Sequence, residues 1–186
     1  YVHEGSGGDG FALLLLNESQ VAVDGFSVGR AGGSLGYTGN PGITGGYLAV
    51  GFDEFGNFSA TNSDRSDGPG RNPQSITVRG AGDEAEGSSD DAYPHLVTES
   101  PSGEIDGGWR WARVTADPVS EAESLALHIE MSYDDRDSWE TIIDNELSAE
   151  DIGEDIPEEF LLGFSGATAG ATNIHAIDSV TVSESS

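Results

Sequence analysis

Short apolar stretches recur about every ten to fifteen residues along the chain, and turn-forming residues separate them. Residues 125–133 alternate cleanly between apolar and polar positions, which predicts a strand with one buried face. Residues 11–16 are apolar at every position, so we expect a central strand that is covered on both faces. This rhythm is typical of an antiparallel β-sandwich. The remaining predicted strands are residues 34–37, 46–52, 75–79, 109–115, 139–143, 160–164 and 174–182.

The other segments are short and polar. Residues 148–157 are expected to hold a single helical turn capped by Ser148. Residues 83–91 are acidic and rich in Ser and Gly, which predicts a solvated loop. No apolar run is long enough to cross a bilayer, so we expect no membrane insertion. The sequence therefore predicts an all-β fold in one domain, residues 1–186.

The chain begins within what looks like the end of a strand. Tyr1-Val2-His3-Glu4 is interpreted as the tail of a longer strand that runs directly into a glycine-rich turn. We therefore expect a fragment of a larger surface protein whose N-terminal strands are missing. The oligomeric state is left open, because such strands could be the ones that pair.

The charge balance restricts the possible partners. The 186 residues carry 34 acids against 7 bases, a formal net charge of −27, and every base is an arginine. Such a surface repels nucleic acid and anionic membranes, which excludes both as partners. Salt screens self-repulsion of this size, with a Debye length of roughly 3 Å at 1 M, so we expect either a halophilic source or a surface protein bathed in calcium-rich brine. Cysteine is absent, so a bound divalent cation is one candidate source of rigidity in place of disulfides.

The most informative segment is residues 45–57, Gly-Gly-Tyr-Leu-Ala-Val-Gly-Phe-Asp-Glu-Phe-Gly-Asn. An apolar run enters a turn in which Asp53, Phe55 and Asn57 share one parity and start out on one face. Carboxylate, amide and backbone carbonyl oxygens are the hard ligands that calcium selects. The alternative is a polar hairpin loop with a turn-forming Gly-Asn pair.

Two further segments combine glycines with polar groups. Asp9 lies between glycines just before the most apolar strand, where a bend leaves room for a ligand. Residues 163–175 form a run of tiny residues whose exposed amides suit a hydroxyl-bearing ligand. A simple turn and a flexible connector, respectively, are the structural alternatives.

In this order the segments resemble the L-type lectins, the concanavalin A-like family that includes legume lectins and related bacterial surface modules. The match covers almost the whole chain, from Gly7 to Val182, and residues 51–59 with 72–80 look closer to bacterial adhesin-type members than to plant ones. Its parts are Asp-Gly before an apolar strand, Gly-Gly-x-Leu-Gly from Gly32 to Gly36, Val-x-Phe-Asp-x-Phe-x-Asn from Val50 to Asn57, and Gly-Phe-Ser-x-x-Thr followed by a histidine from Gly163 to His175.

The resemblance implies a jelly-roll sandwich whose loops bind a glycan or polysaccharide, at the cell surface or outside the cell, in adhesion. Asp9 would accept hydrogen bonds from two sugar hydroxyls, after a peptide bond that is often cis in this family. Gly33 would donate its amide and Asn57 its side-chain amide. The backbone around Gly170 and Ala171 would close the site.

The resemblance also implies a calcium ion that locks Asn57 toward the sugar. Its ligands would be Asp53, the carbonyl of Phe55 and Asn57. Asp67 is favoured as the fourth protein ligand, with Asp64, Asp90 and Asp91 as alternatives. The second metal of plant members is expected to be absent, because Gly51 and Ser75 stand at its ligand positions. His175 is expected to pack under the loop rather than bind metal.

Three functions remain in competition. A calcium-dependent lectin module is favoured over a structural module that binds nothing, because a fold can outlive its site. A glycoside hydrolase needs two carboxylates across a groove, whereas Asp53 and Glu54 are adjacent and point to opposite faces, so no enzyme is expected. Aromatic rings near the binding end could stack on a sugar or belong to the core. These rings are Tyr37, Tyr47, Phe58 and Tyr93.

Overall fold

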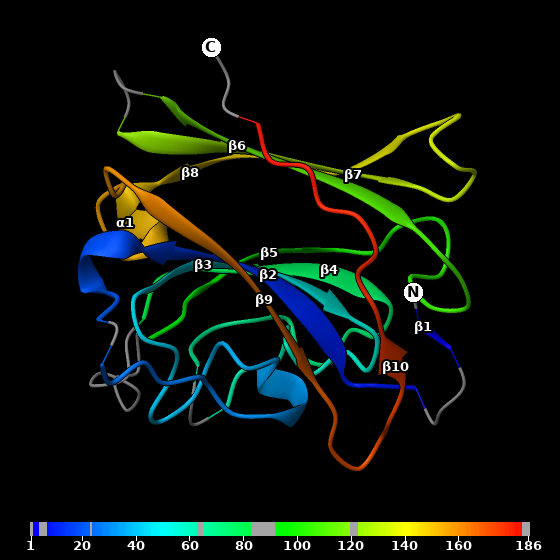
Figure 1. Ribbon diagram of the computed structural model, residues 1–186, viewed down its shortest axis with the longest axis horizontal. Helices are drawn as coiled ribbons and strands as arrows, with labels where there is room; N and C mark the ends of the chain where they lie inside the picture. Colours follow the sequence, from blue (N-terminus) through cyan, green and yellow to red (C-terminus); the bar gives the residue numbers. More distant parts are fainter. Residues whose placement is uncertain are drawn as a thin grey trace.

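The computed structural model describes residues 7–22, 24–62, 65–82, 92–119 and 123–183, and the backbone of residues 2–3. Two antiparallel sheets lie against each other (Figure 1), so the prediction of an all-β sandwich is confirmed. None of the described helices is long and apolar enough to cross a membrane. The acidic segment 83–91 lies outside the described residues.

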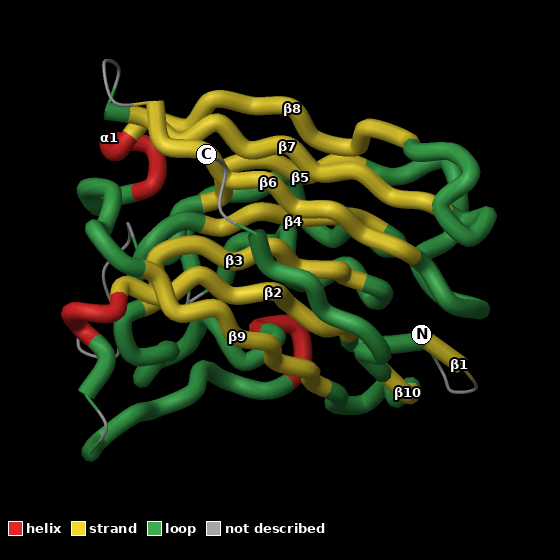
Figure 2. Tube along the Cα trace, turned by 45° about the horizontal axis from the view of Figure 1, so that its top comes forward, coloured by secondary structure: helices red, strands yellow, loops and turns green. Residues whose placement is uncertain are grey.

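The larger sheet has five strands in the order β5-β4-β3-β2-β9, and the smaller sheet has three in the order β6-β7-β8 (Figure 2). The larger sheet consists of β2 (Gly10–Asn17), β3 (Gly46–Asp53), β4 (Ser75–Arg79), β5 (His95–Glu99) and β9 (Phe160–Ala167). The smaller sheet consists of β6 (Trp111–Val119), β7 (Ser124–Ser132) and β8 (Glu140–Ser148). The short elements are β1 (Val2–His3), which pairs with β10 (Ile174–His175), the 3-10 helices η1 (Glu18–Gln20) and η2 (Gly32–Ser34), and α1 (Ala149–Ile152).

The first hydrophobic core lies between the two sheets. Apolar residues of β7 alternate inward as the sequence predicts, and they pack against one face of β3 and β4. Phe11 of β2 stacks on Phe52 of β3 with ring centroids 4.7 Å apart. The inward residues of β7 are Leu125, Leu127, Ile129 and Met131.

A second core lies on the other face of the five-stranded sheet, where the long loops cover it. Leu14 and Leu16 of β2 pack there against Leu35, while the opposite face of β2 is half-buried toward the first core. The prediction that this strand is covered on both faces is therefore confirmed. The loops that carry the sequence motifs belong to this second layer.

Two predicted strands are wrong and one strand was not predicted. Residues 34–37 form the end of η2 and a turn, because Leu35 and Gly36 have positive φ angles that a strand cannot contain. Only β10 forms within residues 174–182, and the rest of that segment pairs with no described strand. The strand β5 has too short an apolar run to stand out. The capped turn at Ser148 is confirmed, with a capping box between Ser148 and Asp151.

Candidate functional site

The ends of three adjacent strands bring the sequence motifs together. Gly10 at the start of β2 pairs with Asp53 at the end of β3 and with Ala167 at the end of β9. Because β2 is antiparallel to both neighbours, residues just before β2 meet residues just after β3 and β9. Asp9 and the two turns that follow β3 and β9 therefore share one edge of the five-stranded sheet.

The backbone of Asp9 is held between these two turns. Its amide donates to the carbonyl of Ala167 at 3.1 Å, and its carbonyl accepts from the amide of Phe55 at 3.0 Å. The Gly8–Asp9 peptide bond is cis, as the resemblance implies. The position of Asp9 is thus fixed by main-chain contacts on both sides.

The carboxyl group of Asp9 is buried and incompletely paired. Only 3% of the residue is exposed, and Oδ2 has no hydrogen-bond partner among the described residues. Burial raises the pKa of this carboxyl, and a hydrogen bond with the Ala169 backbone opposes that rise only in part. A buried acceptor without a donor costs free energy, so a donor brought by a ligand is stabilising at this atom.

Glycine allows the η2 turn to approach this carboxyl. A Cβ at Gly32 would lie 3.2 Å from the Ala169 Cβ and 3.8 Å from Asp9 Oδ2. A Cβ at Gly33 would lie 2.4 Å from the Cβ of Asn57, closer than real Cβ atoms come. Gly33 and Asn57 therefore lie against each other.

Small residues after β9 form a wall beside Asp9. A Cβ at Gly8 would lie 3.1 Å from the Cβ of Ala171, so Ala171 packs on the residue that precedes Asp9. Gly170 is exposed, and a Cβ there would meet nothing within 4 Å. Ala171 thus packs beside Asp9, and Gly170 is exposed next to it in the chain.

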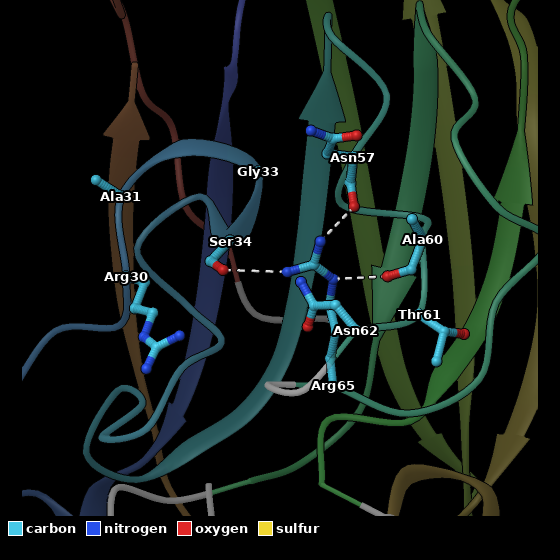
Figure 3. A pocket seen from close by; sticks show the side chains of 9 residues that line it. All are labelled: Arg30, Ala31, Gly33, Ser34, Asn57, Ala60, Thr61, Asn62 and Arg65. Atoms are coloured by element: carbon cyan, nitrogen blue, oxygen red, sulfur yellow. Dashed lines mark hydrogen bonds between the residues drawn. The ribbon is translucent and has the colours of Figure 1, made fainter. Parts of the chain in front are cut away.

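An open depression of about 390 Å³ adjoins Gly33 and Asn57 (Figure 3). Arg65 lies in its floor with 4% of the residue exposed. The Arg65 guanidinium donates to the carbonyl of Ala60 at 2.8 Å, to the carbonyl of Asn57 and to Ser34 Oγ at 3.0 Å. The depression therefore presents polar groups, and the described residues that line it include no acidic residue.

The carboxylate of Asp53 does not face this depression. The residue is fully buried, Oδ1 accepts from the amide of Gly56 at 2.8 Å, and Oδ2 accepts from the amide of Phe58 at 2.6 Å. Burial raises the pKa of Asp53 to about 6, although these hydrogen bonds and the charge of Arg65 lower it. Asp53 thus caps the turn after β3 from inside.

The other expected calcium ligands are also engaged or distant. The carbonyl of Phe55 accepts from Arg71 Nε at 2.9 Å. The side chain of Asp67 is exposed, while its carbonyl accepts from Arg79. Among the described residues, no group of three or more acidic, His or Cys side chains is placed to hold a metal ion. The described residues do not fit the calcium site that the resemblance implies. Asp64, Asp90 and Asp91 lie outside the described residues.

The sequence did not point to Arg79, which is fully buried beneath the loops. Its guanidinium donates to the carbonyls of Phe58 at 2.7 Å, Ser66 at 2.7 Å and Tyr93 at 2.8 Å. Weaker bonds reach Ala60 and Asp67. Burial lowers the pKa of Arg79 to about 9, so the group remains charged at neutral pH. The available signal for this role in the sequence was that Arg79 is a basic residue at the end of a buried strand.

Glu54 and His175 form a second buried polar group behind the site. Glu54 Oε1 accepts from Asn173 Nδ2 at 2.7 Å, and Oε2 lies 3.4 Å from His175 Nε2. Both residues are largely buried, and burial raises the pKa of Glu54 and lowers that of His175. His175 packs under the turn after β3, the structural position that the sequence suggested.

The aromatic side chains that could have stacked on a ligand belong to the core. Tyr37, Tyr47, Phe58 and Tyr93 are fully buried. Tyr37 contacts Phe58 and Tyr93 edge to face, with centroids 6.4 and 5.2 Å apart. His95 begins β5 and shares a hydrogen bond with Thr98. The four fully buried rings are therefore not available to a ligand.

Comparison with known proteins adds no relative. No protein-family model, no curated protein and no solved structure matches the chain.

Proposed function

We propose that the chain is a lectin module that binds a saccharide at the edge formed by Asp9, Gly33, Asn57 and residues 169–171. The observation that carries this proposal is the buried Oδ2 atom of Asp9, which lacks a hydrogen-bond donor among the described residues. A sugar hydroxyl both donates and accepts, so it supplies that donor and accepts from neighbouring amides. The adjacent open depression gives further sugar units room.

Access to Asp9 is controlled by small residues. Gly32 and Ala169 are the groups that approach Oδ2 from outside, and the side chain of Ala169 is exposed. A hydroxyl reaches Oδ2 when the loop that carries Ala169 moves aside.

The acidic composition supports a salt-rich medium, and the proposed saccharide binding supports a place outside the cell or on its surface. A net charge of −27 is tolerated best where salt screens it. One shallow site gives modest affinity, so a role in adhesion requires several copies or domains acting together. Calcium has no part in the proposed binding step, because the described residues do not fit it.

A hydrolytic role receives less support from the geometry. Among the described residues, none that lines the depression carries a carboxylate, and both oxygens of Asp53 accept backbone hydrogen bonds. Hydrolysis of a glycosidic bond requires two carboxyl groups on either side of the bond. The site is therefore better suited to holding a saccharide than to cleaving it.

The test compares the wild-type chain with Asp9→Asn on an array of glycans and polysaccharides. Asp137→Asn is the matched control, because it makes the same change at an exposed turn of the smaller sheet. A hydrogen bond to a charged group contributes about 1.5–3 kcal/mol, so Asp9→Asn is expected to weaken binding about tenfold or more. Asp137→Asn is expected to bind like wild type.

Two results would overturn the proposal. Wild-type protein that binds no saccharide on the array would leave a structural module as the better account. Equal binding by wild type and Asp9→Asn would place the pocket elsewhere.

A further inference from the structure

We propose that guanidinium groups of this chain hold residues 53–60 in their binding conformation, and that the site requires no divalent cation. The claim about the loop stands on contacts within the protein. The claim about ligand binding rests on the proposed function.

Two of the groups that a cation would need already accept hydrogen bonds within the protein, namely the Asp53 carboxylate and the Phe55 carbonyl. Both carboxylate oxygens of Asp53 accept backbone amides, at 2.8 Å from Gly56 and 2.6 Å from Phe58. Calcium takes six to eight oxygen ligands, including waters, whereas Asp53 has no exposed surface. The turn therefore closes around its own amides rather than around an ion.

Arg65 links the two segments that form the site. Its Nε and Nη2 atoms donate to the carbonyls of Ala60 and Asn57, after β3. Its Nη1 atom donates to Ser34 Oγ at 3.0 Å and to Thr38 Oγ1 at 3.3 Å, in the loop that carries Gly33. One planar guanidinium thus ties the Asn57 turn to the Gly33 turn (Figure 3).

Arg79 and Arg71 hold the same loop from below and from outside. Arg79 joins Phe58 to Ser66 through two carbonyls at 2.7 Å each. Arg71 donates to the carbonyl of Phe55 at 2.9 Å, and its guanidinium carbon lies 4.2 Å from the centre of the Phe55 ring. Thus three of the seven arginines in the chain bind carbonyls of this loop.

These arginines both replace and exclude a divalent ion. A guanidinium attached to the chain supplies positive charge and several directed donors without depending on a free ion concentration. The guanidinium groups bonded to the carbonyls of Phe55 and Asn57 are positively charged, so they also repel a cation that approaches these oxygen atoms. The loop is consequently organised in a metal-free protein.

The direct test measures thermal stability and ion uptake at fixed high NaCl. Melts are recorded in EDTA, in CaCl₂ and in MgCl₂, and calcium uptake is followed by titration calorimetry. Magnesium controls for the general effect of a divalent ion on an acidic surface. We expect the same Tm in calcium and in magnesium and no saturable uptake of one calcium ion.

A calcium site would give a different result in this test. A site filled by calcium at a hundred times its Kd would raise the Tm by about 5–10 °C over magnesium. If that calcium-specific gain appears in wild type and disappears in Asp53→Asn, the inference is wrong. This arm does not depend on whether a saccharide binds.

The second experiment tests whether the arginines hold the residues of the saccharide site in position. Arg65→Lys keeps the charge but cannot bridge four acceptors, and Arg113→Lys makes the same change in a half-exposed side chain of β6. In EDTA, we expect Arg65→Lys to bind the strongest array saccharide about tenfold more weakly than Arg113→Lys, as the loss of one charged hydrogen bond implies. Addition of calcium should not restore it.

Arg71→Lys keeps this arm decisive if Arg65→Lys does not fold, because Arg71 is exposed. Weaker binding by Arg71→Lys supports the inference. Binding equal to wild type in both variants contradicts it. If wild type itself binds no saccharide, the proposed function fails, whereas the calcium measurement still decides whether the loop is metal-free.

Discussion

Replacement of Arg79 by methionine tests the buried guanidinium at the centre of the loop layer. Arg79→Met keeps an unbranched apolar stem and removes the donors to three buried carbonyls, those of Phe58, Ser66 and Tyr93. An unsatisfied buried carbonyl costs about 1–3 kcal/mol, so the three together cost about 3–9 kcal/mol. Removing a buried charge also removes its desolvation penalty, which offsets several kcal/mol. At the middle of that range we expect a net loss of about 3 kcal/mol in the free energy of unfolding.

The assay is thermal and urea unfolding at molar NaCl, with Arg113→Met as the matched control. The Arg113 side chain is 53% exposed and bonds Glu130 at 2.7 Å, a surface pair that contributes about 0–1 kcal/mol. For a chain of this length, 1 kcal/mol shifts the Tm by about 2–4 °C, so Arg79→Met should melt about 10 °C lower. If the two variants melt at the same temperature, the role assigned to Arg79 is refuted.

Three further predictions concern the site, the helix cap and the charge. Gly33→Ala should abolish saccharide binding and lower the Tm, because the new Cβ meets Asn57 at 2.4 Å, whereas Gly163→Ala within β9 should do neither, because its Cβ would meet Leu14 at an ordinary 3.9 Å; array binding and melts of both variants check this. Ser148→Ala should cost about 1 kcal/mol in urea unfolding through loss of the N-cap, and an unchanged midpoint would contradict the role of the cap. The Tm should rise between low and molar NaCl because salt screens a net charge of −27, and equal melts would refute the halophilic interpretation.

The parts of the fold that the sequence predicts are those in which burial alone decides the structure. The strands β2, β3 and β7 follow from their apolar pattern, because each is covered by a core on at least one face. The segment 34–37 fails, since positive φ angles at Leu35 and Gly36 override its apolar residues. A pattern of side chains does not encode that backbone choice unless the glycines are given priority.

For the site, the sequence likewise predicts which residues lie close together but not which of their atoms are free to bind a ligand. Spacing and resemblance predict that Asp9, Gly33 and Asn57 lie together, because each flanks a strand or a tight turn. They do not reveal which atoms remain available. The Asp53 carboxylate is used by amides of its own turn, and Arg65 and Arg79 use the carbonyls around it. An arginine looks the same in sequence whether it is solvated or fully buried.

The most direct test of the central claim is a crystal structure of the protein soaked, in EDTA, with the saccharide that gives the strongest array signal. We expect a sugar hydroxyl within hydrogen-bond distance of Asp9 Oδ2, with the sugar against Gly33 and Asn57 and the turn after β3 unchanged. A saccharide bound at another face, or an Asp9 carboxylate still covered by Ala169 in the complex, would contradict the account.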